Sequence, residues 1–235
     1  PLNVGVPGVY SRKSANRALL ETDLVFFIGS HTGSQVTHFW ALPPTGTRVI
    51  QLDINPEELG RHYPNEVSLM GDCKVSLSAM LEQTGSLSSI NDRSGWVKRA
   101  QTLVAEWHSE VDALMESDAI PIRPERICHE LNNWLPNNAI MMTDTGHSGM
   151  WTGGFVDLKP GQDFLRAAGS LGWGLPAAIG AKLGAPERPV VLFSGDGGFW
   201  YHFPELETAV RWNVPIIVIV NNNSSLNQGV GEEIA

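Results

Sequence analysis

Two short groups of residues near the end of the chain carry the most chemical information. They are Gly195-Asp196-Gly197 and Asn222-Asn223. Carboxylate and amide oxygens are hard donors and suit Mg²⁺, a cation that takes few protein ligands and completes its octahedron with water and phosphate oxygens. Glycine backbone beside these donors lets a phosphate group approach closely. The residue types therefore predict a site for a metal-bound diphosphate.

Each group directly follows a run that is typical of a buried parallel strand. These runs are residues 189–194 and 215–220, and the segment 203–212 between them has helical character. In a strand–helix–strand unit the two strands lie parallel, so the residues that follow them emerge at the same carboxyl edge of the sheet. We therefore expect Asp196 and Asn223 to lie close together at that edge.

This pattern resembles the cofactor signature of thiamine-diphosphate-dependent enzymes. In that family the aspartate of Gly-Asp-Gly and the second asparagine lie about 27 positions apart, and here 223 − 196 = 27. Gly-Asp-Gly alone is more often a surface turn, so the spacing and the flanking strands carry the resemblance. Longer phrases are similar to the acetolactate synthase group of the family, and the likeness covers nearly the whole chain: residues 8–16, 49–56, 71–72 and 172–181.

The resemblance implies a role for each residue of the two groups. Asp196 and the side-chain oxygen of Asn223 would ligate Mg²⁺, and the backbone carbonyl of Ser225 would be a third ligand. The N–H groups of Gly197 and Gly198 would face the diphosphate, which a helix start favours. The alternative for the asparagines is a plain polar turn.

Two further segments have counterparts in the family. The loop 143–148 would touch the diphosphate, and the turn 169–172 would hold the aminopyrimidine ring, with Leu171 supporting the cofactor in a bent shape. The alternatives are an exposed histidine at a helix start for His147 and an ordinary core leucine for Leu171. The complete set of cofactor contacts implied by the resemblance is Thr145, Gly146, His147, Gly169, Leu171, Gly195, Asp196, Gly197, Gly198, Asn223 and Ser225.

No residue of this chain is assigned as the catalytic base. The family takes its activating glutamate from a pyrimidine-binding domain of a partner subunit, and that domain would precede Pro1. The chain opens with Pro1 rather than Met and stops at Ala235, shortly after the asparagines. We therefore expect a fragment of a longer protein that is inactive by itself.

Composition narrows the class of protein. The chain has 235 residues, 42% of them hydrophobic and 17% charged, and a net charge of −9, which argues against a nucleic-acid surface. No apolar run is long enough to span a membrane, and no signal peptide opens the chain. Cys73 and Cys128 form no metal-binding spacing, so we expect both to be buried free thiols in a reducing cytoplasm.

The alternation of strand-like and helix-like segments predicts an α/β protein with two parallel-sheet domains. The first, a Rossmann-like central domain, would cover residues 1–85, with strands at 24–28, 49–53 and 67–70. Residues 86–124 would form a linker with a long helix at 93–115. The diphosphate- and Mg-binding domain would cover residues 125–235, be truncated at its C-terminal end, and contain a first strand at 139–142.

The resemblance implies thiamine-diphosphate- and Mg-dependent decarboxylation or carboligation of a 2-oxo acid by a homodimer or homotetramer. Two alternatives are an acyl-CoA lyase or decarboxylase of the oxalyl-CoA type and a diphosphate-binding module without catalysis. Flavin is doubtful, because acetolactate synthases bind it with an arginine-rich loop after the first strand. Here that loop, residues 29–35, contains no arginine.

Overall fold

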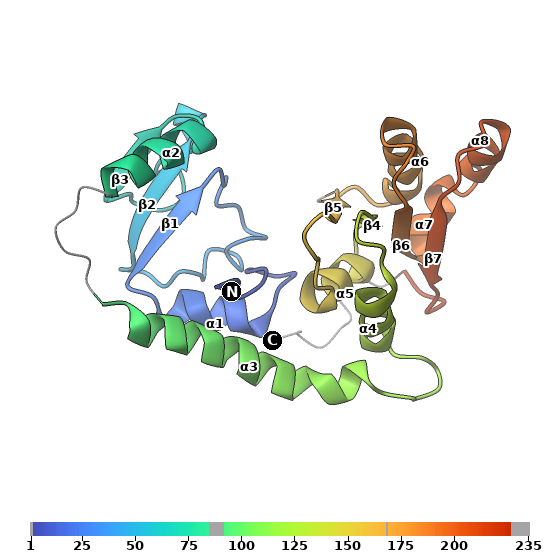
Figure 1. Ribbon diagram of the computed structural model, residues 1–235, viewed down its shortest axis with the longest axis horizontal. Coiled ribbons are helices and arrows are strands. Elements are labelled where there is room, and N and C mark those ends of the chain that lie inside the picture. Colours follow the sequence, from blue (N-terminus) through green and yellow to red (C-terminus); the bar gives the residue numbers. More distant parts are fainter. Residues whose placement is uncertain (1, 85–91, 168, 227–235) are drawn as a thin grey trace. The chain divides into compact units, whose positions relative to one another are not determined.

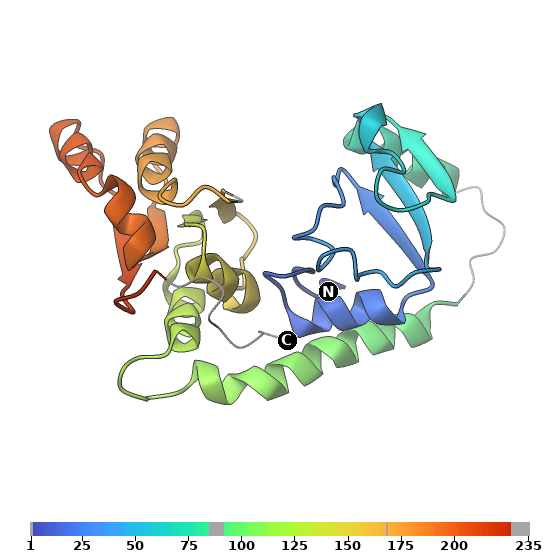
Figure 2. The same cartoon turned by 180° about the vertical axis from the view of Figure 1, so that it is seen from behind.

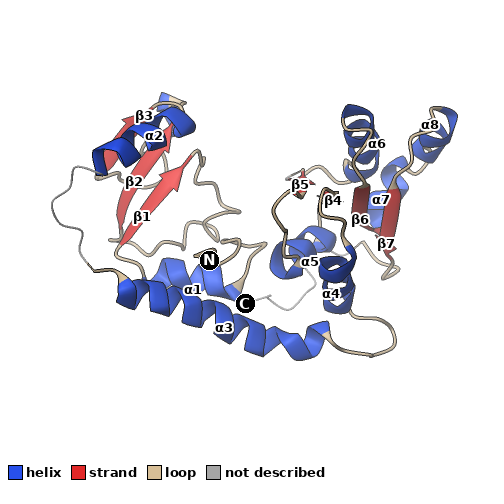
Figure 3. Ribbon diagram, viewed as in Figure 1, coloured by secondary structure: helices blue, strands red, loops and turns tan. Residues whose placement is uncertain are grey.

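Strands and helices alternate along most of the chain (Figure 3). The computed structural model describes residues 2–84, 92–167 and 169–226. Contacts between residues divide the chain into two units, Pro1–Ser109 and Glu110–Ala235. Each unit contains its own parallel sheet with helices (Figure 1), which confirms the predicted α/β class.

The sheet of the first unit has the strand order β1-β2-β3, with all pairs parallel. The three strands confirm the predicted positions, and they are β1 (Leu24–Ile28), β2 (Arg48–Asp53) and β3 (Val67–Met70). The helices are α1 (Lys13–Glu21), the 3-10 helix η1 (Pro56–Glu58), α2 (Cys73–Thr84) and α3 (Ser94–Met115), the last of which crosses the boundary between the units.

The core of the first unit is built from alternate side chains of β1 together with one side chain of β2. Val25, Phe27 and Val49 form a buried cluster, and Leu19 of α1 and Tyr63 pack against it. The rings of Phe27 and Tyr63 stack at 5.7 Å between centroids. This cluster holds the sheet against α1. The carboxyl ends of the strands are followed by loops.

Helix α1 and the N-terminal part of α3 lie side by side in both views (Figure 1, Figure 2). Arg99 of α3 reaches Glu21 of α1 at 2.6 Å, and Arg17 of α1 reaches Glu106 of α3 at 3.3 Å. The hydrogen bond and charge of Arg99 lower the pKa of Glu21. These ion pairs are partly exposed, so they orient the helices more than they stabilise them.

The sheet of the second unit has the order β5-β4-β6-β7, and again all pairs are parallel. Its strands are β4 (Ile140–Thr143), β5 (Asp163–Arg166), β6 (Val190–Gly195) and β7 (Ile217–Asn221). Its helices are α4 (Pro124–Trp134), α5 (His147–Phe155), α6 (Gly174–Gly184), α7 (Asp196–His202) and α8 (Glu205–Arg211).

The central strands β4 and β6 are buried on both faces, as is typical of parallel sheets. On one face Ile140, Met142, Val190 and Leu192 form a buried cluster with Leu175 and Ala178 of α6. The alternate residues Met141, Val191 and Phe193 are fully buried as well, so they pack on the opposite face. The sheet is therefore a rigid platform for the loops at its carboxyl edge.

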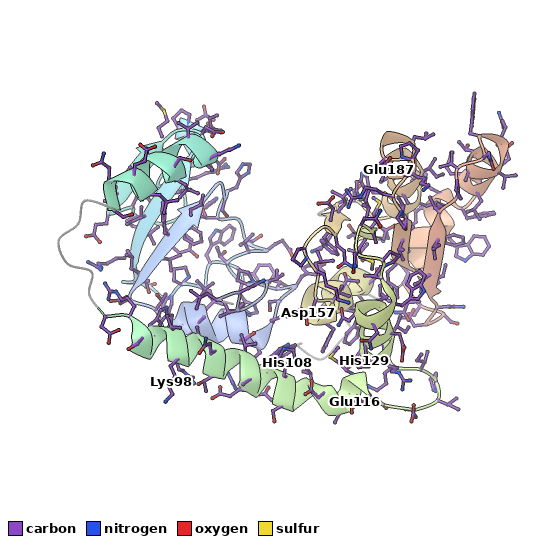
Figure 4. The ribbon with its side chains drawn as sticks, viewed as in Figure 1. Lys98, His108, Glu116, His129, Asp157 and Glu187 are labelled. Carbon is purple, nitrogen blue, oxygen red and sulfur yellow. The ribbon has the colours of Figure 1, made fainter. Side chains whose placement is uncertain are left out.

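One side chain of α4 bonds to both the end of α5 and the segment that follows it. Asn132 donates to the carbonyl of Phe155 at 2.8 Å and accepts from the N–H of Asp157 at 2.7 Å. Figure 4 places His129 on α4 and Asp157 just beyond α5. Asp157 belongs to the connection from α5 to the start of β5, so it lies toward the amino edge of the sheet.

The helix predicted at 203–212 is confirmed as the slightly shorter α8, which begins after Pro204, but the separate α7 that begins at Asp196 was not predicted. Within the part of the chain that the structure describes, no helix is long and apolar enough to cross a membrane.

The prediction that both cysteines are buried is right for one of them. Cys128 is 0% exposed in α4, whereas Cys73, the first residue of α2, is only partly buried. The physical reason is that α2 contributes no buried residue to the unit. Burial, with a smaller contribution from the charge of Glu125, raises the pKa of the Cys128 thiol to about 12.

We predict that iodoacetamide alkylates Cys73 much faster than Cys128 in the native protein. The thiolate is the reacting species, and Cys128 is both inaccessible and kept protonated by its surroundings. Peptide mass spectrometry after timed labelling measures both rates, and labelling in denaturant is the control in which the rates should converge. Equal rates of alkylation of the two cysteines in the native protein would contradict the burial of Cys128 in α4.

Candidate functional site

The pairing of β6 with β7 brings the two groups of polar residues to neighbouring positions. In the parallel register Ser194 lies opposite Val220 and Gly195 lies opposite Asn221. Asp196 and Asn222 are the next residues along the two strands. The carboxylate and the asparagines therefore leave the sheet from adjacent strand ends, as the strand–helix–strand pattern predicts.

The loop after β7 lies against the start of α7. A Cβ placed on Gly197 would come within 2.5 Å of the side chain of Leu226, which shows how closely the loop after β7 approaches α7. Asn223 is exposed, and its Oδ1 accepts from the N–H of Ser225 at 3.0 Å. An amide oxygen has two lone pairs, so this bond leaves one available to a cation.

The segment after β4 forms the second wall of this edge. Thr145 donates its hydroxyl to the carbonyl of Ala167 at 2.9 Å, which ties the segment to the end of β5. Gly146, with φ of 104°, precedes α5, and His147 is the partly buried first residue of that helix. Ser148 in the first turn is 2% exposed, and its hydroxyl has no hydrogen-bond partner among the described residues.

Asp144 is the most connected side chain of the site. It is 1% exposed, and its Oδ1 accepts from the N–H groups of Thr145 at 2.7 Å and Gly172 at 3.0 Å. Its Oδ2 accepts from the N–H of Gly174 at 3.2 Å. The carboxylate thus joins the end of β4 to the turn that precedes α6.

That turn contains the predicted ring-binding residues. Gly169 is exposed, and Leu171 is partly buried and is not a member of the buried core. Gly172, with φ of 88°, lies so close to α7 that a Cβ there would be 2.5 Å from the Cβ of Tyr201. The turn therefore presents Leu171 beside α7.

All of the predicted cofactor-binding residues lie on four segments at the carboxyl edge of one sheet. The segments are the β4–α5 loop, the turn before α6, the β6–α7 junction and the loop after β7. Contacts join them in series: Asp144 binds Gly172, Gly198 approaches the Asp144 carboxylate, and Gly197 approaches Leu226. The structure thus gathers these residues, although they are up to 80 positions apart (225 − 145 = 80).

The arrangement suits an anion accompanied by a cation. A Cβ on Gly146, Gly169 or Gly195 would meet no atom within 4 Å, so the backbone of three segments borders open space. Among the described residues no three His, Cys, Asp or Glu side chains cluster to hold a metal. A cation held by Asp196 would therefore draw its other ligands from amide, backbone or phosphate oxygens, as Mg²⁺ commonly does.

Sequence reasoning did not single out two residues that organise this edge. Asp144 directly follows a buried strand, just as Asp196 does, so the same strand-end argument could have found it. His202, whose Nδ1 lies 3.0 Å from the carbonyl oxygen of Gly172, gives no comparable signal in the sequence.

We predict that Gly174→Ala lowers the free energy of unfolding by about 1–3 kcal/mol, the usual cost of overpacking. Its new Cβ would come within 2.8 Å of Leu192 and 2.9 Å of the Asp144 carboxylate. Gly180→Ala is the matched control in the same helix, because its Cβ meets nothing and alanine favours a helix. Denaturant unfolding followed by circular dichroism measures both, and equal stabilities would contradict the described contact.

Comparisons with known proteins agree with this geometry. Residues 1–80 match the family described as thiamine pyrophosphate enzyme, central domain, and residues 144–232 match thiamine pyrophosphate enzyme, C-terminal TPP binding domain. The second match begins at Asp144 and contains all four segments of the site. It supports thiamine diphosphate as the ligand class of the second unit.

Curated relatives give the same result along almost the whole chain. The chain is 30% identical to the probable acetolactate synthase large subunit of Methanococcus aeolicus and 31% identical to that of Methanocaldococcus jannaschii, with 96% of this chain covered in each case. It is 32% identical to the acetolactate synthase large subunit of Corynebacterium glutamicum, again over 96% of its length. The chain spans 40%, 39% and 36% of these relatives, respectively.

Proposed function

Because the chain belongs to the thiamine pyrophosphate enzyme family, we propose that the complete protein binds thiamine diphosphate and Mg²⁺ at the carboxyl edge of the β5-β4-β6-β7 sheet. There it decarboxylates a 2-oxo acid, joins two such acids, or does both, as an acetolactate synthase-like enzyme. The 2-oxo acid is the small-molecule partner, and the active protein is a homodimer or homotetramer.

The observation that carries this proposal is the pairing of Gly195 with Asn221 across β6 and β7. It brings the two strand ends that Asp196 and Asn222-Asn223 follow to neighbouring positions of the sheet, which supports a shared site for a carboxylate and an amide oxygen. Hard oxygen donors of this number leave room for water and diphosphate oxygens around Mg²⁺. In this assignment Asp196 and Asn223 ligate the ion through their side chains and Ser225 through its carbonyl oxygen.

The diphosphate itself finds donors on the facing segments. The positive end of the α5 dipole lies at Gly146 and His147, where negative charge is favoured. The buried hydroxyl of Ser148 in the same turn has no other partner among the described residues, and an anion would supply one. Gly197 and Gly198 add backbone N–H groups on the opposite side.

The ring end of the cofactor would lie at the turn before α6. Gly169 offers its carbonyl, and Leu171 offers an apolar surface that keeps the bent shape. When bound, thiamine diphosphate supplies the electron sink that accepts the pair released as CO₂ leaves. In this proposal residues of this chain hold and orient that group, and no residue here is assigned as the base.

The sequence of the first unit does not favour flavin binding. The loop that follows β1, residues 29–35, contains no arginine. Asp53 at the end of β2 is buried and accepts from the N–H of Asn55 at 2.9 Å, as a turn-forming residue does. We therefore assign thiamine diphosphate and Mg²⁺ as the cofactors and leave flavin out.

We predict that Asp196→Ala weakens Mg²⁺-dependent binding of thiamine diphosphate by at least about 100-fold, because a cation loses its only charged protein ligand. Isothermal titration calorimetry of the protein expressed from its complete reading frame measures this affinity. Asp157→Ala is the matched control: it removes an exposed aspartate of the same unit, in the connection from α5 to β5 (Figure 4). Unchanged affinity in Asp196→Ala would contradict the metal assignment.

A further inference from the structure

We infer that Asp144 and His202 are positioning residues that hold the turn before α6 and the start of α7 as one unit. They thereby set the distance between Leu171 and Asp196. The inference rests on the proposed function, in which these two residues serve opposite ends of the same bound molecule. Neither Asp144 nor His202 needs to touch that molecule for this role.

The first part of the unit is the buried Asp144 carboxylate. Burying a charged group costs several kcal/mol in real proteins. Here the charge is met by three backbone N–H groups, those of Thr145, Gly172 and Gly174. Two of these donors belong to the turn before α6, so the turn cannot move from β4 without leaving the carboxylate unsatisfied.

The second part is Gly172, which is held on both sides of its backbone. Its N–H donates to Asp144 at 3.0 Å, and its carbonyl oxygen lies 3.0 Å from Nδ1 of His202. A carbonyl can only accept, so Nδ1 of His202 carries the proton in this contact. The positive φ of Gly172 and its approach to Tyr201 leave no room for another residue type.

The third part is the direct approach of α7 to the same carboxylate. A Cβ on Gly198 would lie 3.1 Å from both Cγ and Oδ2 of Asp144. Gly198 is the third residue of α7, and Asp196 is the first. One buried side chain therefore contacts both the turn that carries Leu171 and the helix turn that carries the metal ligand.

The consequence concerns binding of a molecule that spans both segments. Supporting residues must hold a site to within a fraction of an ångström for it to work well. If the hydrogen bond of the Gly172 N–H or that of the Gly172 carbonyl is lost, Leu171 and Asp196 can shift relative to each other. Affinity for the whole cofactor should fall, although every contacting residue is still present.

His202 provides the sharper test because it is exposed, so its substitution should not prevent folding. His202→Leu removes the donor and keeps the bulk. His202→Asn keeps an N–H donor on Cγ, where Nδ1 of histidine is attached. His129→Leu, on α4, is the matched control for loss of an imidazole elsewhere in the unit (Figure 4).

Calorimetry with thiamine diphosphate and Mg²⁺ on the complete protein should show affinity about tenfold weaker in His202→Leu, as expected for one hydrogen bond. His202→Asn should stay within about twofold of wild type, and so should His129→Leu. Equal weakening in the Leu and Asn variants, or none in His202→Leu, would overturn the inference. A wild-type protein that does not bind thiamine diphosphate would instead contradict the proposed function.

Asp144 is tested without any cofactor. In Asp144→Asn the new NH₂ group must face either the N–H of Gly174 or the N–H groups of Thr145 and Gly172, so at least one of the Gly172 and Gly174 amides loses its acceptor and its protection. Hydrogen exchange read on peptides covering residues 171–176 should become at least about tenfold faster, while exchange in β1 and β2 stays as in wild type. Unchanged exchange at Gly172 and Gly174 would overturn the role of Asp144.

Discussion

The binding edge of the second unit depends on one buried carboxylate. Asp144 is 1% exposed and is held by three backbone N–H groups from two segments. Hydrogen bonds to a charged group contribute about 1.5–3 kcal/mol each, which is the size needed to offset the cost of burying it. Because the donors are backbone groups, the carboxylate dictates where the chain runs. That single side chain therefore fixes the turn before α6 relative to the end of β4.

The sequence predicted well wherever the signal was an apolar run. The strands at 24–28, 49–53 and 67–70 are β1, β2 and β3, close to the predicted bounds. The exit of Asp196 and the asparagines from adjacent strand ends followed from the rule that parallel strands end at the same edge. Topology alone was sufficient there, because no long-range contact had to be known in advance.

Prediction from the sequence was poor where helices contain several glycines and where contacts between residues distant in the sequence decide the structure. A helix start at His147 was only an alternative because α5 contains three glycines, and the four-residue β5 has too few residues for a clear pattern. The predicted helix 203–212 missed α7, whose sequence begins with Asp-Gly-Gly. The contact of His202 with Gly172 joins residues 30 positions apart, which no local pattern encodes. Asp144 was within reach of the strand-end argument but was not considered.

A crystal structure of the complete protein with thiamine diphosphate and Mg²⁺ tests the account most directly. We expect a metal ion bound by the Asp196 carboxylate and the side-chain oxygen of Asn223, with the diphosphate at the start of α5. We also expect that Asp144 still accepts from the N–H groups of Gly172 and Gly174. A metal ion on other residues, or an Asp144 carboxylate that has left Gly172 to bind the cofactor, would contradict the account.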